Sequence, residues 1–179
     1  MRRRVISALV LAAVVIGAVL AFAVTKPPTV TIERSVDIKA PSERIFPLIN
    51  DLRRWSEWPT ADAQSTAPKT FGPVSSGTGA TAEWSGSGSA GAGRMEITES
   101  VPPSKVVVVV DFTRPFTAHN VNEFTLVPRG DLTHVRWLWR GQNVFLLKLM
   151  SVFTSPDTMM GAHFESGLTA LKTKAESQP

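Results

Sequence analysis

Few side chains in this protein are able to transfer protons near neutral pH. Its 179 residues include three histidines, no tyrosine and no cysteine. Imidazoles, phenols and thiols are common acid–base groups and nucleophiles in active sites. His119 and His134 have charged neighbours in register, Glu123 and Arg136, which predicts that they face outward. His163 adjoins an apolar stripe, where a rim position is favoured over catalysis, so we assign no catalytic residue from the sequence.

The spacing of the polar residues predicts neither a metal nor another cofactor. The histidines lie far apart, and a chain without cysteine lacks the usual zinc-ligand patterns. Residues 86–91 match the dinucleotide fingerprint G-x-G-x-x-G, but that fingerprint requires a helix immediately after it. Residues 94–98 have the alternating pattern of a strand instead. The glycine-rich segment is therefore predicted to be a hairpin loop.

The N-terminal sequence predicts association with a membrane. Three arginines, Arg2 to Arg4, precede about twenty almost wholly apolar residues at 5–24, which is the length that spans a hydrocarbon core of about 30 Å. A signal peptide usually has a shorter apolar region, although Ala21 and Ala23 offer a cleavage site. A retained single-pass anchor over residues 1–25 is favoured. The basic start predicts a cytoplasmic N-terminus and an extracytoplasmic domain, secreted or periplasmic if the segment is cleaved.

The net charge of +4 does not indicate a nucleic-acid partner. Four of the 19 basic residues, Arg2, Arg3, Arg4 and Lys26, flank the apolar run, which leaves 15 basic residues against 15 acidic ones beyond Lys26. Nucleic-acid binders concentrate several lysines and arginines on one face. The exported part shows no such cluster, so we expect no nucleic-acid partner.

The elements predicted after a linker at residues 26–28 form one domain of ordinary size over residues 29–176. Residues 29–39 alternate as a half-buried strand, with Arg34 pointing inward or at an edge. Ser42 is predicted to cap a helix, a short helix follows at 52–58, and residues 61–76 are predicted to be a loop. Five further strands, separated by glycine or proline turns, are predicted at 79–84, 94–100, 105–112, 118–127 and 132–140.

The C-terminal third predicts a long amphipathic helix. Ser155, Pro156 and Asp157 combine a cap, a proline at the first helical position and an acid in the first turn. Beyond them, apolar residues recur at helical spacing, so we expect this helix to pack on the sheet. Strands connected by short turns form an antiparallel meander. The predicted class is therefore α+β, preceded by one transmembrane helix.

Several short motifs along residues 29–176 occur together in a recognisable order. They include Ala40-Pro41 with Phe46, Asn50-Asp51-Leu52 with Trp55 and Trp58, Gly77-Thr78-Gly79-Ala80 with Trp84, Gly93-Arg94-Met95-Glu96-Ile97, Thr133-His134-Val135 with Trp137, and Phe164-Glu165-Ser166-Gly167-Leu168. This order resembles the START-like or SRPBCC superfamily, in its polyketide cyclase/dehydrase and lipid-transport branch. The resemblance implies a helix-grip fold, in which a curved antiparallel sheet wraps a long C-terminal helix around a cavity for an apolar molecule.

Alternation along the predicted strands indicates which side chains face such a cavity. Aromatic rings give large, stiff apolar surfaces, and a few polar groups orient a ligand. The ligand contacts predicted in this way are Trp84, Phe112, Asn122, Phe124, Trp137, Trp139, Met160 and Phe164. The alternative is that these side chains fill a solid core. Arg34 and Arg94 are able to meet an anionic head group, but salt bridges at a sheet edge are favoured.

Residues 144–153 are mostly apolar, and Lys148 is the one charged residue among them. They predict either a short core helix or an apolar rim that rests on a bilayer. The favoured function is binding or transport of an apolar small molecule or lipid at the outer face of a membrane. The alternatives are a cyclase/dehydrase-like lyase or isomerase using the same cavity, and a non-catalytic interaction module.

Overall fold

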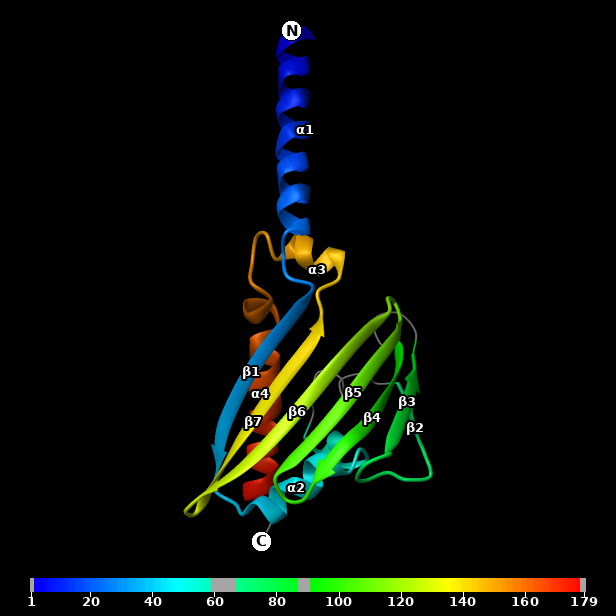
Figure 1. The fold of residues 1–179 in the computed structure, drawn as a ribbon, viewed down its shortest axis with the longest axis vertical. Helices are drawn as coiled ribbons and strands as arrows, with labels where there is room; N and C mark the ends of the chain where they lie inside the picture. The colour runs from blue at the N-terminus through cyan, green and yellow to red at the C-terminus, as the bar shows by residue number, and fades with distance from the viewer. Residues whose placement is uncertain (1, 59–66, 87–90, 178–179) are drawn as a thin grey trace.

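The computed structural model describes residues 2–58, 67–86 and 91–177 (Figure 1). A long helix, α1, comes first, and the chain then alternates between strands and short helices before a second long helix, α4. The elements are α1 (Arg2–Val24), β1 (Thr29–Ile38), α2 (Ser42–Asn50), the 3₁₀ helix η1 (Arg54–Glu57), β2 (Lys69–Phe71), β3 (Thr81–Ser85), β4 (Ala92–Val101), β5 (Lys105–Arg114), β6 (Ala118–Arg129), β7 (Leu132–Gln142), α3 (Phe145–Met150) and α4 (Pro156–Glu176).

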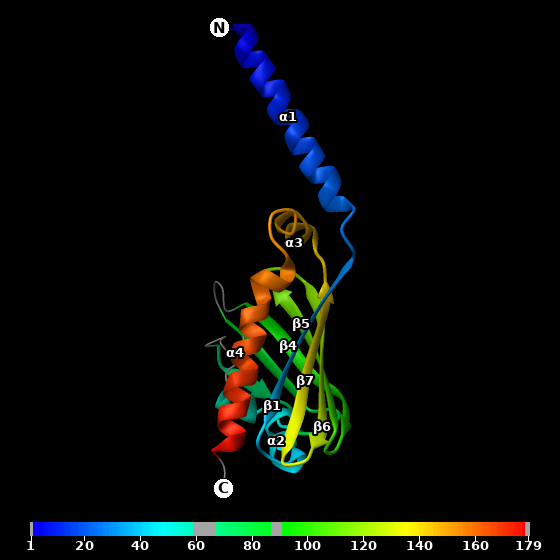
Figure 2. The same cartoon turned by 90° about the vertical axis from the view of Figure 1, so that its left-hand side faces the viewer.

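The strands form one antiparallel sheet in the order β1-β7-β6-β5-β4-β3-β2. From β2 to β7, each strand pairs with its neighbour in sequence, as the predicted meander requires, and β1 closes the series by pairing with β7. The sheet is curved, and α4 runs along one of its faces (Figure 2). The architecture is the predicted α+β helix grip.

The face of the sheet toward α4 carries the apolar side chains. Along β7, Val135, Trp137 and Trp139 are buried, and the residues between 133 and 137 alternate between buried and partly exposed. The same alternation runs through β5 and β6, because successive side chains of a strand point to opposite faces. For β5, β6 and β7, the inward-facing side chains were therefore predicted correctly.

One half of the interior is packed solid by aromatic rings. Trp58 lies edge-on to Phe124 and to Trp137, with ring centroids 6.1 Å and 6.3 Å away, and Trp55 lies 5.4 Å from Trp58. Trp55 of η1 and Trp58 just after it donate their indole N–H to carbonyl oxygens of α2, that of Trp55 to Ile49 and that of Trp58 to Leu48. Their polar atoms are thus satisfied while the rings fill the core.

The start of α4 is fixed by its cap and by an arginine of the edge strand. The Ser155 side chain accepts a hydrogen bond from the Thr158 backbone N–H at 3.0 Å, as predicted for the cap. Arg34, on β1, binds both carboxylate oxygens of Asp157 and donates from Nε to Glu165 at 2.7 Å. Arg34 therefore lies at the sheet edge in ion pairs that join β1 to α4.

Three local predictions were wrong. Ser42 does not cap α2: Pro41 occupies the cap position, and the buried Ser42 hydroxyl lies 3.4 Å from that of Thr133. The predicted loop at 61–76 contains the edge strand β2, a segment too short to show alternation; residues 59–66 lie outside the described part. The region around α3 is not a core helix, since Phe145 and Phe153 are exposed.

The N-terminal helix α1 projects from the α3 end of the domain (Figures 1 and 2). The linker after it is fixed by Asn143, whose backbone N–H and side-chain amide donate to the carbonyls of Pro28 and Pro27, each at 2.8 Å. Among the described residues, no helix has both the length and the apolar character needed to cross a membrane. The structure therefore gives no support to the transmembrane helix predicted at this end.

Candidate functional site: a cavity between the sheet and α4

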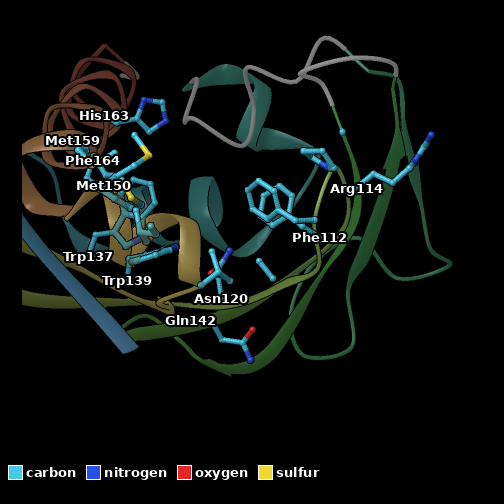
Figure 3. A pocket seen from close by; sticks show the side chains of 17 residues that line it. Phe112, Arg114, Asn120, Trp137, Trp139, Gln142, Met150, Met159, His163 and Phe164 are labelled. Atoms are coloured by element: carbon cyan, nitrogen blue, oxygen red, sulfur yellow. The ribbon is translucent and has the colours of Figure 1, made fainter. Parts of the chain in front are cut away.

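A cavity of about 700 Å³ lies between the sheet and the first turns of α4 (Figure 3). Its walls come from the ends of β5 and β7, the start of β6, α3 and α4. The residues that line it are mostly apolar: Gly91, Phe112, Arg114, Pro115, Phe116, Ala118, Asn120, Trp137, Trp139, Gln142, Val144, Leu147, Met150, Met159, Met160, His163 and Phe164. The volume falls within the range of about 300–1,000 Å³ that holds drug-sized ligands.

One wall of the cavity is a stack of three aromatic rings. Phe164 of α4 lies edge-on to Trp137 at 4.8 Å and 6.0 Å from Trp139, measured between ring centroids. The Trp139 ring lies directly on the backbone of Gly141, where a Cβ atom would overlap it. Glycine at 141 thus lets the indole lie flat against β7 and leaves the space above it open.

The opposite wall is formed by Phe112 and the turn between β5 and β6. Phe112 packs edge-on against Trp84, with ring centroids 5.4 Å apart. Phe116, at the turn, is 54% exposed and borders the cavity mouth. Met150 of α3 also lines the mouth and is largely exposed. The cavity therefore opens toward the end of the domain from which α1 projects.

Four polar side chains line this apolar space. Asn120 and His163 project into it from the sheet and from α4, whereas Gln142 and Arg114 are exposed near its edge. The Arg114 guanidinium donates to the Ser85 hydroxyl at 2.8 Å, and Figure 3 shows it extending away from the aromatic wall. Burial lowers the pKa of His163, and its Nε2 atom has no hydrogen-bond partner among the described residues.

The structure brings five of the eight predicted ligand contacts to the cavity: Phe112, Trp137, Trp139, Met160 and Phe164. The other three lie elsewhere. Phe124 belongs to the solid aromatic half of the core, Asn122 accepts a hydrogen bond from Trp137 Nε1 at 2.9 Å, and Trp84 packs behind Phe112. That any of the eight binds a ligand stays a prediction.

None of the four polar lining residues was in the predicted set of eight. Asn120 lies on the same strand face as Asn122, two positions earlier, so the alternation that turns Asn122 inward does the same for Asn120. His163 had been placed at a rim; it is one helical turn beyond Met159, which also lines the cavity. The helical spacing from Met159 was the available signal for His163.

The remaining charged candidates form surface ion pairs. His119 lies 2.6 Å from Asp111 and His134 lies 2.7 Å from Asp37, away from the cavity. Arg94 pairs with Glu96 at 2.9 Å on the exposed side of β4. In the parts of the chain that the structure describes, no three histidine or carboxylate side chains gather as a metal site. These groups stabilise the sheet surface and do not form a second reactive centre.

A curved antiparallel sheet that grips a C-terminal helix over an apolar cavity defines the helix-grip class of ligand-binding domains. The family model described as polyketide cyclase/dehydrase and lipid transport matches residues 29–176. The chain belongs to this family. A search among curated proteins found no significant sequence match.

Solved structures share this fold at low sequence identity. Protein MLL2253 from Mesorhizobium loti is 19% identical with a TM-score of 0.59, over 84% of this chain and 98% of its own. Protein CV1439 from Chromobacterium violaceum is 16% identical with a TM-score of 0.56, over 85% and 100%. DynU16, a putative protein in the dynemicin biosynthetic locus, is 14% identical with a TM-score of 0.56, over 85% and 48%. At these identities the likeness concerns the fold alone.

Proposed function

We propose that this protein binds an apolar small molecule or lipid in the cavity between the sheet and α4, and carries it at the outer face of a membrane. The observation that carries the proposal is the cavity of about 700 Å³ with its aromatic and methionine walls. Burial of apolar surface drives such binding, at about 25 cal/mol per Å² before the costs of association are subtracted. The family membership supports a ligand-binding role.

The rim of the cavity supports the membrane part of the proposal. Phe116 and Met150 are exposed and line the cavity, and Phe145 and Phe153, within and just after α3, add two further exposed rings, 52% and 78% exposed, to an apolar border. This border adjoins the end of α1, the helix formed by the basic and apolar N-terminal segment. An apolar rim held at the bilayer would let a lipid-like ligand enter without crossing water. In this arrangement the domain lies on the extracytoplasmic side of the bilayer.

The test of carriage is mass spectrometry of organic extracts from the purified full chain. Ala118 lines the cavity and Thr117 beside it is exposed, so Ala118→Trp fills the cavity while Thr117→Trp adds the same side chain outside it. We expect a stoichiometric apolar molecule in the wild type and in Thr117→Trp, and its loss in Ala118→Trp. Equal extracts from all three proteins would argue against the cavity as a binding site.

The rim is tested by transfer of a fluorescent lipid from vesicles to the protein. Phe145→Asp and Leu149→Asp, together with Phe153→Asp, place charges at the proposed contact. Val127→Asp is the matched control, because Val127 is similarly exposed near the β6–β7 turn at the far end of the sheet. We expect transfer to slow several-fold in the rim variants only. Unchanged transfer in those variants would contradict the proposed membrane contact.

A second candidate function is a cyclase- or dehydrase-like lyase or isomerase. The specific observation in its favour is His163, a neutral imidazole that lines the cavity without a hydrogen-bond partner among the described residues. A general base needs its nitrogen within about 3 Å of the proton that it removes. Among the described residues, no carboxylate pairs with His163 to orient its ring, whereas Asp111 and Asp37 pair with His119 and His134. Binding is therefore favoured over catalysis.

A further inference from the structure

The cavity contains a buried amide that lacks a partner. Asn120 is only 8% exposed, lines the cavity, and makes no side-chain hydrogen bond to any other described residue. Figure 3 shows it rising from the sheet between Trp139 and Phe112, into the open space. Buried polar groups are nearly always hydrogen-bonded, because leaving one unpaired costs stability. The amide borders the cavity, where water is able to bond to it, so a ligand that displaces this water has to supply the partner instead.

The polar character continues along the same strand face. Asn122, two residues further along β6, is 1% exposed, and its Oδ1 accepts from Trp137 Nε1. Because an indole N–H only donates, this contact fixes the oxygen of the amide and leaves Nδ2 as a donor without a partner. Asn122 does not line the cavity, so Asn120 is the amide of this strand face that a ligand is able to reach.

The facing wall adds a neutral imidazole. His163 lines the cavity from α4, and burial keeps the pKa of this side chain below its usual value of about 6.5. A neutral imidazole has one donor nitrogen and one acceptor nitrogen. The Asn120 amide itself has a donor and an acceptor, so this part of the lining offers both kinds of hydrogen bond to a ligand without offering charge.

Among the described residues, no positively charged side chain lines the inner part of the cavity. Of the lining residues, Arg114 alone carries a permanent charge, and it is exposed at the edge and bound to Ser85. A carboxylate or phosphate placed beside Asn120 would be buried without a counter-ion, which is unfavourable. An uncharged oxygen in the same place does not incur this cost of burying a charge.

We propose that the cavity selects uncharged apolar molecules that carry a hydroxyl or carbonyl oxygen, and that Asn120 is the residue that recognises this oxygen, with His163 facing it. The inference rests on the proposed ligand-binding function and specifies the ligand class. It distinguishes the site from one for plain hydrocarbons and from one for fatty acids.

The test measures competition by four probes of equal chain length against a bound fluorescent lipid: dodecane, dodecanol, a dodecanone and dodecanoate. The full chain is compared with Asn120→Leu, a change of similar size that removes the amide. Thr117→Leu is the control, since Thr117 is exposed and does not line the cavity. To remove the effect of water solubility, each affinity is expressed as a ratio to that for dodecane.

We expect Asn120→Leu to lower the dodecanone-to-dodecane and dodecanol-to-dodecane ratios by about three- to tenfold, the worth of one hydrogen bond. Thr117→Leu should leave both ratios unchanged. Dodecane affinity should be retained in Asn120→Leu, which also reports that the variant is folded. If that variant does not fold, Asn120→Ser provides the same comparison with a smaller change.

Two different failures are separable. If the wild type binds the probes but the ratios do not change in Asn120→Leu, or if dodecanoate binds most tightly, the assignment of Asn120 and of an uncharged oxygen is wrong while ligand binding stands. If no probe competes with the lipid, or if Ala118→Trp binds as the wild type does, the proposed function fails together with the inference.

Discussion

Trp137 connects the solid half of the interior to the hollow half. Its ring contacts Phe124 on the packed side, at 4.8 Å between centroids, and Phe164 on the cavity side, also at 4.8 Å. Its indole N–H donates to Asn122 within the sheet. One side chain therefore supports the core and the wall of the binding space at the same time.

Replacing Trp137 with phenylalanine should cost about 1–3 kcal/mol of unfolding free energy from the hydrogen bond alone, because the Asn122 oxygen is left buried and unpaired. The measurement is chemical denaturation. Trp139→Phe is the control, since Trp139 makes no side-chain hydrogen bond to another described residue. An equal loss in both variants would assign the cost to ring size instead.

The imidazole of His163 should make stability depend on pH. Burial lowers its pKa in the folded protein, so folding opposes protonation of this group. Its contribution is therefore complete above the unfolded value of about 6.5 and decreases as the pH falls below it. We expect the unfolding free energy of the wild type to decrease more between pH 7 and about pH 5 than that of His163→Leu. Parallel pH profiles would contradict this.

At the residue scale, alternation predicted the inward face well but not which inward side chains border open space. Phe124 and Trp139 both point inward from neighbouring strands. Phe124 is covered by Trp55 and Trp58, which come from a 3₁₀ helix nearly seventy residues earlier in the chain. Since that packing is long-range, no local pattern separates the filled half from the open half.

At the scale of elements, the start of α4 determines the position of three lining residues. Met159, Met160 and His163 all lie in its first two turns. Replacing Ser155 with alanine should remove the cap and cost about 1 kcal/mol, because the Thr158 N–H loses its acceptor. Denaturant unfolding measures the loss, and Ser155→Asp should restore most of it.

Elements with a strong local signal were predicted and those without one were not. Strands β5, β6 and β7 alternate over many residues between clear turns, and α4 begins with a serine, a proline and an acid. The edge strand β2 is three residues long and is defined by its pairing with β3. Ser42 has the residue type of a cap, but its hydroxyl turns to the buried Thr133 instead.

At the scale of the whole molecule, ligand binding should appear as added stability. A ligand that binds only the folded state at a hundred times its dissociation constant raises the unfolding free energy by about 2.7 kcal/mol. We expect this gain with a dodecanone for the wild type and Thr117→Trp, measured by thermal unfolding. Ala118→Trp, whose new side chain occupies the cavity, should show no gain; an equal gain there would place binding elsewhere.

The sequence predicted the overall fold more securely than it predicted the function of the cavity. The order of motifs along residues 29–176 indicated a helix grip, and the family match covers the same residues. The size of the cavity depends on how far α4 stands from the sheet. That distance is determined by side chains such as Phe164 and Trp139 packing together, which the motif order does not specify.

The arrangement of the tryptophans also makes the protein its own optical reporter. Trp137 and Trp139 border the cavity, and Trp58 and Trp55 follow within 6.3 Å and 5.4 Å of the next ring inward. With no tyrosine in the chain, ultraviolet emission comes almost entirely from the five tryptophans, these four and Trp84. Exchange of water for an apolar ligand at Trp139 would shift that emission to shorter wavelength. Occupancy of the cavity is thus readable in real time, without a label.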